Sequence, residues 1–206
     1  MKIGVLGGTF NPIHNSHIYL AEQFVWQLGL DRMVVVPTYT PPHKKAENLA
    51  SSEDRYNMCR LATRDLPRFH VTRFELERQG KSYTYKTLGH ILGKYPGSQL
   101  FLIVGADMFL TMQDWRRAPE IFNMATICAA QREKGELALL DAHKQELEAI
   151  GAKCVIINVE AKPLSSTRVR ERIASGEKPD GLLHPDVWKY IAERGLYACP
   201  RKAVPL

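Results

Sequence analysis

The first part of the chain that could carry out chemistry is a pair of glycines followed closely by two histidines, in the run Gly7-Gly8-Thr9-Phe10-Asn11-Pro12-Ile13-His14-Asn15-Ser16-His17. Adjacent glycines let backbone amides approach a polyphosphate with no side chain between them, and the start of a helix favours bound anions. His14 and His17 are three residues apart, so both lie on one face of a first helical turn. Imidazoles placed there can donate hydrogen bonds to phosphoryl oxygens. The run therefore predicts a phosphate site.

Other interpretations of this run fit its spacing less well. A single histidine at the start of a helix is more often a cap or a packed surface group than a catalyst, but two histidines beside a glycine pair favour a catalytic role. A zinc site would need His-Glu-x-x-His spacing or a third ligand nearby, and the sequence shows neither, so no metal held by the protein is predicted. The run also differs from the dinucleotide-binding and P-loop patterns, which disfavours an NAD dehydrogenase and a P-loop kinase.

The elements that must position this site are predicted by the hydropathy pattern. Short apolar runs predict buried strands at 2–6, 33–36, 99–104, 125–130 and 153–159, with a less regular strand at 69–74. Helical spacing marks 16–28, 52–65, 84–95 and 136–150. This alternation predicts an α/β fold, a Rossmann-like doubly wound parallel sheet with helices on both faces. Gly7 and Gly8 then lie at the carboxyl end of the first strand, where such folds bind ligands.

The pattern changes after residue 164. Two short helices, at 165–175 and 185–194, indicate a small helical C-terminal cap rather than another strand-helix unit. A chain of 206 residues is long enough for one sizeable core and short for two. We therefore expect a single domain over 1–206, with an α/β core over 1–164 and a helical part over 165–206.

Composition narrows the class of partner. A formal net charge of +6 is compatible with nucleic acid, an anionic membrane or a small polyphosphate. Lysines and arginines are spread along the chain without a basic tail or an aromatic RNA-binding strand, so we expect no nucleic-acid partner. No apolar stretch is long enough to span a membrane and no signal-peptide pattern follows Met1, so we expect a cytoplasmic protein with no membrane partner. Four widely spaced cysteines are expected to be free thiols: Cys59, Cys128, Cys154 and Cys199.

Two runs resemble the signatures of the HIGH-type nucleotidyltransferase superfamily. The first run is similar to Gly-Gly-x-Phe-[Asp/Asn]-Pro-x-His-x-Gly-His, with Ser16 in place of the last glycine. The run Leu164-Ser165-Ser166-Thr167-Arg168-Val169-Arg170 is similar to Ile-Ser-Ser-Thr-x-x-Arg. By itself the second run could be a helix cap followed by an exposed basic helix, but beside the first it indicates a second anion cradle. The resemblance implies that His14, His17 and Arg170 are catalytic. It also implies ATP contacts from Gly7, Gly8, Thr9, Phe10, Gly105, Asp107, Ser165, Ser166 and Thr167.

Three further runs resemble the nicotinate-nucleotide branch of that superfamily, and extend the resemblance over nearly the whole chain. Pro41-Pro42-His43-Lys44, in the polar stretch 37–50 that we interpret as a substrate loop, is similar to the branch's phosphate-holding loop. Ser82-Tyr83-Thr84-Tyr85-Lys86-Thr87-Leu88 is similar to the run beside its pyridine pocket. Gly105-Ala106-Asp107, with Trp115 eight residues after Asp107, is similar to its Gly-x-Asp and Trp pair.

These runs imply roles in binding nicotinate mononucleotide. Lys44 would hold its phosphate, Thr84 would hydrogen-bond its carboxylate, and Trp115 would stack on its pyridine ring. Arg132 would add a phosphate contact, although Glu133 stands where the family has proline. Three of these residues also have a plainer interpretation: Lys44 as a solvated charge, which fits the next residue Lys45 better, Thr84 as an N-cap, and Trp115 as a core or surface-cap aromatic.

The activity implied by the resemblance is transfer of the AMP part of ATP to nicotinate mononucleotide, with release of pyrophosphate, in NAD biosynthesis. Mg²⁺ would arrive with ATP, and a homo-oligomer remains open. One alternative is an adenylyltransferase acting on nicotinamide mononucleotide or on another phosphorylated acceptor. A second alternative, from another class, is a non-catalytic protein that senses nucleotides or binds nucleic acid. Both histidines are present, which favours the enzyme.

Overall fold

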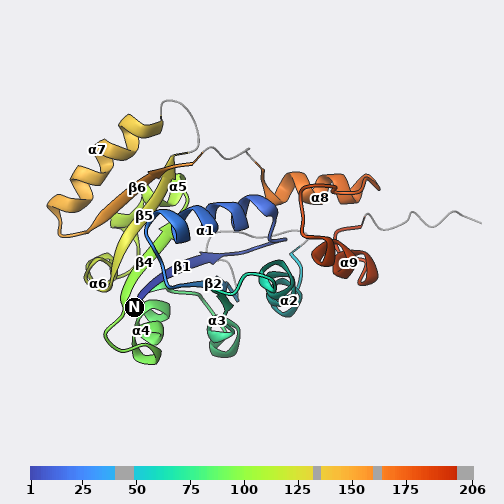
Figure 1. The fold of residues 1–206 in the computed structure, drawn as a ribbon, viewed down its shortest axis with the longest axis horizontal. Helices are drawn as coiled ribbons and strands as arrows, with labels where there is room; N and C mark the ends of the chain where they lie inside the picture. The colour runs from blue at the N-terminus through green and yellow to red at the C-terminus, as the bar shows by residue number, and fades with distance from the viewer. Residues whose placement is uncertain (40–48, 132–135, 160–163, 199–206) are drawn as a thin grey trace, which may run out of the picture.

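Six strands form one parallel sheet in a computed structural model that describes residues 1–39, 49–131, 136–159 and 164–198 (Figure 1). The strands are β1 (Lys2–Gly8), β2 (Arg32–Pro37), β3 (Phe69–Val71), β4 (Gln99–Val104), β5 (Ala125–Gln131) and β6 (Cys154–Asn158). The helices are α1 (Asn15–Gln27), α2 (Ser52–Thr63), α3 (Phe74–Arg78), α4 (Thr84–Lys94), α5 (Ala106–Phe109), the 3₁₀ turn η1 (Met112–Asp114), α6 (Ala118–Met124), α7 (Glu136–Ala149), α8 (Ser166–Ala174) and α9 (Pro185–Glu193). The predicted fold class is confirmed.

The strand order β3-β2-β1-β4-β5-β6 places the glycine pair at a switch point. From β1 the chain builds outward through β2 and β3, then returns to the other side of β1 and builds outward through β4, β5 and β6. Leu6 of β1 pairs with Ile103 of β4, so the carboxyl ends of these two strands lie side by side. Connections diverge from this point to opposite halves of the sheet, and in folds of this class ligands bind at such a point.

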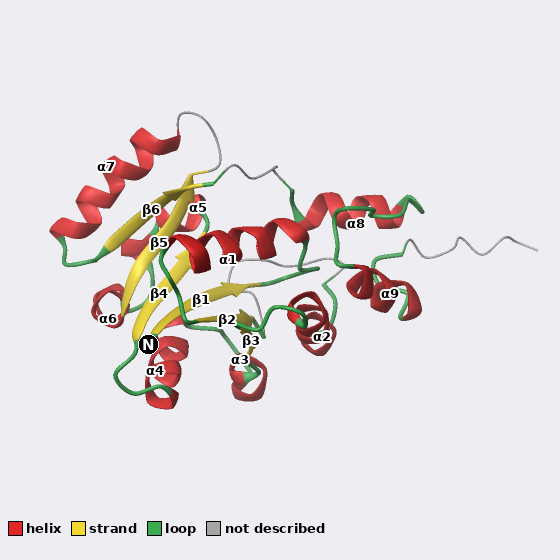
Figure 2. Ribbon diagram, viewed as in Figure 1, coloured by secondary structure: helices red, strands yellow, loops and turns green. Residues whose placement is uncertain are grey.

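Helices cover both faces of the sheet (Figure 2). Alternate side chains of β1 point to opposite faces, with Ile3 and Val5 in one buried cluster and Leu6 in the other. Helices α1, α2, α8 and α9 pack on the Leu6 face, whereas α4, α5, α6 and α7 pack on the opposite one. Because both faces are covered, the strands are rich in apolar residues throughout, as a parallel sheet requires.

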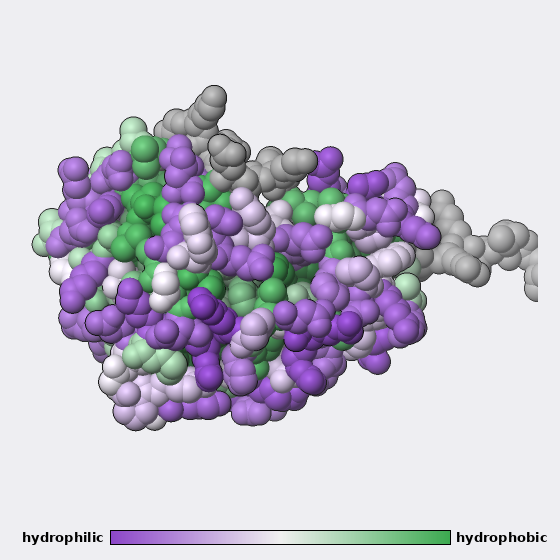
Figure 3. All heavy atoms as spheres, viewed as in Figure 1, coloured by the Kyte–Doolittle hydropathy of each residue, from purple (hydrophilic) through white to green (hydrophobic). Residues whose placement is uncertain are grey.

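The surface is mostly polar on the face seen in Figure 3, with hydrophobic residues showing mainly toward its centre. Among the described residues, no helix combines the length and the apolar character needed to cross a membrane. Three of the cysteines, Cys59, Cys128 and Cys154, are free and buried, as expected, while Cys199 lies outside the described residues.

The expected strand at 69–74 is shorter in the structure. β3 ends at Val71, the Thr72 hydroxyl accepts the backbone N–H of Phe74 at 3.2 Å, and α3 begins there. This local hydrogen bond turns the chain out of the sheet, and explains why the alternation stops near Arg73.

Four short helical segments were not predicted: α3, α5, η1 and α6. Each is too short to show a helical period in the sequence. α6 begins after Arg117, which has a left-handed φ of 60°, and it runs into β5 with no connecting loop. A seven-residue helix joined directly to a strand gives no separate boundary in the hydropathy pattern.

Candidate active site

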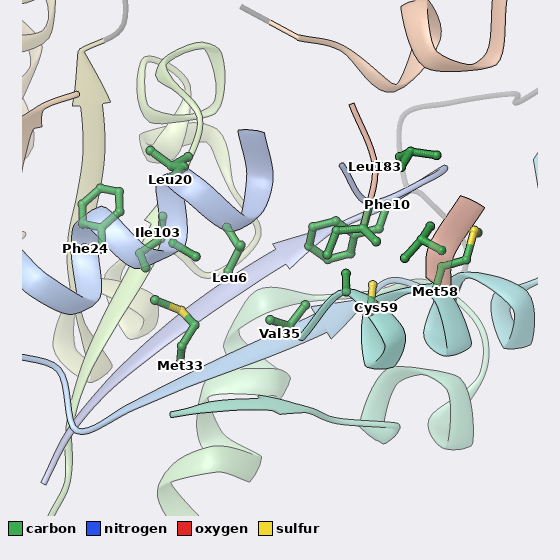
Figure 4. Close-up of a cluster of buried hydrophobic side chains, with 14 of the residues drawn as sticks. Leu6, Phe10, Leu20, Phe24, Met33, Val35, Met58, Cys59, Ile103 and Leu183 are labelled. Atoms are coloured by element: carbon green, nitrogen blue, oxygen red, sulfur yellow. The ribbon is translucent and has the colours of Figure 1, made fainter. Parts of the chain in front are cut away.

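The loop after β1 is shaped by the burial of Phe10. A Cβ on Gly8 would lie 2.9 Å from the Phe10 ring, so this position requires glycine, whereas a Cβ on the exposed Gly7 would meet nothing within 4 Å. Phe10 has a φ of 47° and its side chain enters the core beside Leu183 (Figure 4). A contact of Phe10 with ATP would therefore involve its backbone, while its ring anchors the loop.

The two histidines meet at the start of α1, as their spacing predicts. His14 is the N-cap and His17 is the third residue of the helix, and their rings stack with centroids 3.6 Å apart at 23°. The His14 backbone N–H donates to His17 Nδ1 at 3.2 Å, so a neutral His17 ring carries its proton on Nε2. His14 is 4% exposed, which places one imidazole inside the protein and the other nearer its surface.

The second predicted run docks onto the same loop. Ser166 Oγ donates to the carbonyl of Pro12 at 2.9 Å, and Arg170 Nη1 donates to the carbonyl of Asn11 at 2.8 Å. Arg170 Nη2 also donates to Thr167 Oγ1 at 3.3 Å. Ser165 caps α8, accepting a hydrogen bond from a backbone amide of the first turn. Two runs about 150 positions apart in the sequence are thus joined by direct hydrogen bonds.

Gly105 and Asp107 lie where β4 ends, beside the end of β1. A Cβ on Gly105 would lie 2.6 Å from Asp107 Oδ1, so the carboxylate folds back over a position that has no room for a side chain. Asp107 itself is exposed. The switch point therefore carries the glycine pair on one strand and an exposed carboxylate after its neighbour.

Thr84 and Trp115 belong to segments that contact each other. Thr84 is the first residue of α4, the N-cap is Tyr83, and no side chain caps this helix, so Thr84 does not act as an N-cap. Trp115 is partly buried and packs against the same hydrophobic cluster as Tyr85. The Arg116 guanidinium lies 4.9 Å from the Tyr83 ring centre, which brings the chain after Trp115 beside the start of α4.

Two predicted residues, Lys44 and Arg132, lie outside the described residues, as do Pro41, Pro42 and His43. Among the residues that the structure describes, no group of three or more His, Cys, Asp and Glu side chains could hold a metal ion.

Arg55 was not predicted as a site residue, and its side chain supports the loop after β1 from helix α2. Its side chain is 0% exposed and donates to three backbone carbonyls: Thr9 at 2.8 Å, Tyr39 at 2.9 Å and Ala50 at 3.2 Å. Burial lowers the pKa of this guanidinium, although an arginine remains protonated. One side chain of α2 therefore ties together the loop after β1, the chain leaving β2 and the chain entering α2.

Asn11 receives a second support that the sequence did not reveal. Its Oδ1 accepts the Ala50 backbone N–H at 3.1 Å and the Tyr197 hydroxyl at 2.7 Å. Tyr197 follows α9, and burial raises the pKa of its hydroxyl. Since a neutral phenol keeps its proton to donate, this contact is present at neutral pH and fastens the C-terminal part of the chain to the loop.

Glu75 is a third residue that was missed, and it supports the α4 side of the site. It is 5% exposed and accepts a hydrogen bond from Thr87 Oγ1 at 2.7 Å, which joins α3 to α4. Burial raises the pKa of this carboxyl, and the nearby Ser82, Thr87 and Arg78 oppose only part of that rise. The turn between these helices leads directly into Tyr83 and Thr84.

Comparison with known proteins identifies the family. Residues 5–172 match the cytidylyltransferase-like family. A probable nicotinate-nucleotide adenylyltransferase of Corynebacterium kroppenstedtii is 39% identical over 95% of this chain and 90% of its own length. The nicotinate-nucleotide adenylyltransferase of Bacillus subtilis is 36% identical over 95% of this chain and 98% of its own length.

A solved structure supports the same fold. The nicotinic acid mononucleotide adenylyltransferase of Plasmodium falciparum, complexed with NaAD, superposes with a TM-score of 0.74 at 17% identity, covering 95% of this chain and 97% of its own. The chain belongs to the cytidylyltransferase-like nucleotidyltransferases and, within them, to the nicotinate-nucleotide adenylyltransferase family. The resemblance read from the sequence runs is thereby confirmed.

We predict that Arg55→Met destabilises the protein by roughly 3 kcal/mol, because three buried or partly buried carbonyls lose their donor at once. Urea unfolding followed by circular dichroism measures the loss. Arg68→Met is a matched control, since Arg68 bonds a single carbonyl, that of Leu30, at 3.3 Å. Equal stability of the Arg55 variant and the wild type would show that these bonds contribute little.

We predict that Glu75→Gln stabilises the fold as pH rises. The folded-state pKa of Glu75 is raised, so the unfolded chain loses this proton first, and the wild-type fold loses stability as pH rises from the unfolded pKa to the folded one. The glutamine cannot ionise and keeps an oxygen for Thr87. Its advantage should be absent at low pH and reach a plateau above the folded pKa.

Unfolding free energies measured between about pH 4 and pH 8 check this linkage. Glu77→Gln, which removes a carboxylate from the exposed side of the same helix, is the control. A pH-independent difference between Glu75→Gln and the wild type would contradict the assignment of a raised pKa.

Proposed function

We propose that the protein transfers the adenylyl group of ATP to nicotinate mononucleotide, giving nicotinate adenine dinucleotide and pyrophosphate in NAD biosynthesis. The observation that carries this proposal is the docking of α8 onto the loop after β1, through Ser166 and Arg170. This docking brings together, at the carboxyl end of β1, the two runs that we interpret as anion cradles. The curated relatives that match nearly the whole chain are named for the same activity.

ATP would occupy the switch point. The exposed Gly7 leaves room for a phosphate to approach the backbone, and the loop through Gly8, Thr9 and Phe10 carries the chain past it. Gly105 and the exposed Asp107 carboxylate would meet the adenosine, whose ribose hydroxyls are donors for a carboxylate. The cap of α8, formed by Ser165, Ser166 and Thr167, would provide hydroxyls and helix amides to the remaining phosphates.

Catalysis in this site would come from positioning and charge. The mononucleotide phosphate is anionic at neutral pH and would attack the α-phosphorus in line with departing pyrophosphate, so no general base is needed. His14, His17 and Arg170 would donate hydrogen bonds to oxygens of the α-phosphoryl and leaving groups, where charge is redistributed in the transition state. His17 Nε2 is the donor of that ring, because Nδ1 is occupied by the His14 amide.

Mg²⁺ would accompany ATP. It is a hard cation that binds phosphate oxygens, and its charge would offset that of the triphosphate. The described residues contain no cluster of metal-binding side chains, which fits an ion held mainly by the substrate's own oxygens.

The mononucleotide would bind between α4 and the segment after η1. Trp115 would stack on the pyridine ring, and Thr84 would face the carboxylate at a helix start that has no side-chain cap. Lys44 and Arg132 would hold the phosphate. Both substrates are small charged molecules, so we place the reaction in the cytoplasm and propose no nucleic-acid or membrane partner.

The direct test is pyrophosphate release by purified protein with ATP and Mg²⁺, comparing nicotinate with nicotinamide mononucleotide. We expect release with the acid form well above the amide form. Release with the amide alone would favour the nicotinamide substrate, and binding of ATP without release would favour a non-catalytic role.

We predict that His17→Ala lowers turnover by roughly 100-fold, since losing one such hydrogen bond costs about 3 kcal/mol of barrier. Steady-state kinetics measures turnover, and circular dichroism tests that the fold is kept. Trp26→Ala is the control, because Trp26 lies on the same helix and is 78% exposed. Turnover near the wild-type rate in His17→Ala would exclude the proposed role.

A further inference from the structure

Arg116 lies beside the two residues assigned above to the nicotinate group. It directly follows Trp115, and its Nη1 lies 3.4 Å from the hydroxyl of Tyr83, to which it donates. The guanidinium lies 4.9 Å from the centre of the Tyr83 ring. Tyr83 is the N-cap of α4 and immediately precedes Thr84. A positive charge is therefore held next to the proposed pyridine pocket.

The charge of Arg116 is not offset locally. Across the described part of the chain, Arg116 forms no ion pair with a carboxylate. The first turn of α4 also contains no acidic residue. Arg117 differs, because its Nη1 lies 3.3 Å from a Glu120 carboxylate oxygen, although its guanidinium also lies on a tyrosine ring, that of Tyr85, at 4.8 Å. Arg116 and Arg117 thus make similar ring contacts, but only the charge of Arg117 is offset by a carboxylate.

We propose that Arg116 sets the preference of this site for the acid over the amide form of the mononucleotide. The inference rests on the proposed function. At neutral pH the acid carries a carboxylate where the amide is uncharged, and the two molecules otherwise share the same ring, ribose and phosphate. A nearby uncompensated cation attracts the carboxylate and has little net effect on the amide. The ratio of kcat/KM for the acid to kcat/KM for the amide therefore reports on this charge separately from the contacts that both substrates share.

The test compares kcat/KM for nicotinate and nicotinamide mononucleotide in the wild type, Arg116→Met, Arg116→Lys and Arg117→Met. Arg116→Met should lower the acid-over-amide ratio about tenfold, mainly by raising KM for the acid. Arg116→Lys keeps the charge and should retain most of the ratio. Arg117→Met is the matched control and should leave it unchanged, since Glu120 already offsets that charge.

Salt gives an independent readout. The wild-type ratio should fall between about 0.1 M and about 1 M salt, because the Debye length shrinks from about 10 Å to about 3 Å. The ratio of the Arg116→Met variant should depend less on salt than that of the wild type. A purely structural role for Arg116 would move both substrates together and would leave the salt dependence of the ratio unchanged.

The outcomes separate this inference from the function on which it rests. An Arg116→Met ratio equal to that of an acid-preferring wild type overturns the inference alone. A wild type that uses both mononucleotides equally well also overturns it, and leaves adenylyl transfer standing. A wild type that releases pyrophosphate with neither mononucleotide overturns the proposed function and this inference with it. Because Arg116 is exposed, its variants should fold, and unchanged thermal unfolding verifies that.

Discussion

The site depends on satisfying the backbone carbonyls of the loop that follows β1. Buried polar groups of the backbone must find partners, and this loop belongs to no helix or strand that could provide them. Side chains do so instead: Arg55 bonds the carbonyl of Thr9, Arg170 that of Asn11, and Ser166 that of Pro12. The loop can therefore hold its shape only when α2 and α8 are packed beside it.

This constraint also sets the direction of the peptide groups. In a trans peptide the C=O and the following N–H point in opposite directions. Where Arg55 draws the Thr9 carbonyl toward the protein, the next amide points away from that arginine. The same holds after Pro12, whose carbonyl faces Ser166. The hydrogen bonds to the Thr9 and Pro12 carbonyls thus direct the amides of Phe10 and Ile13 away from Arg55 and Ser166.

The sequence predicted the parts of this arrangement that are local. The glycine pair, the histidine spacing and the cap at Ser165 each depend on residues within one turn or one strand end, and the structure places them as expected. The alternation of apolar runs predicted the parallel sheet for the same reason, because every strand except β3 contributes side chains to the buried clusters on both faces. Long helices were predicted well, whereas the short segments α3, α5, η1 and α6 were missed.

The supporting residues could not be predicted from local pattern. Arg55 follows Glu53 and Asp54 in a charged run, yet its side chain is fully buried. Glu75 lies in a similarly charged run, Phe74-Glu75-Leu76-Glu77-Arg78, and only one of its two glutamates is buried. What distinguishes such residues is a partner far along the chain, as with Tyr197 and Asn11. Periodicity carries no information about such pairs.

The arginines near the site show how much of the net positive charge is available to a ligand. Arg55 directs its donors to three carbonyls and is sealed from solvent, so it acts on the backbone. Arg170 gives one nitrogen to a carbonyl and another to Thr167, and in the proposed site a phosphate adds to those contacts. Arg116 contacts a phenol ring and its hydroxyl, and both leave its charge intact. Net charge alone was compatible with several anionic partners, whereas the contacts of each guanidinium show which charge is used to hold the loop and which is left for the proposed roles at the phosphates and the pyridine ring.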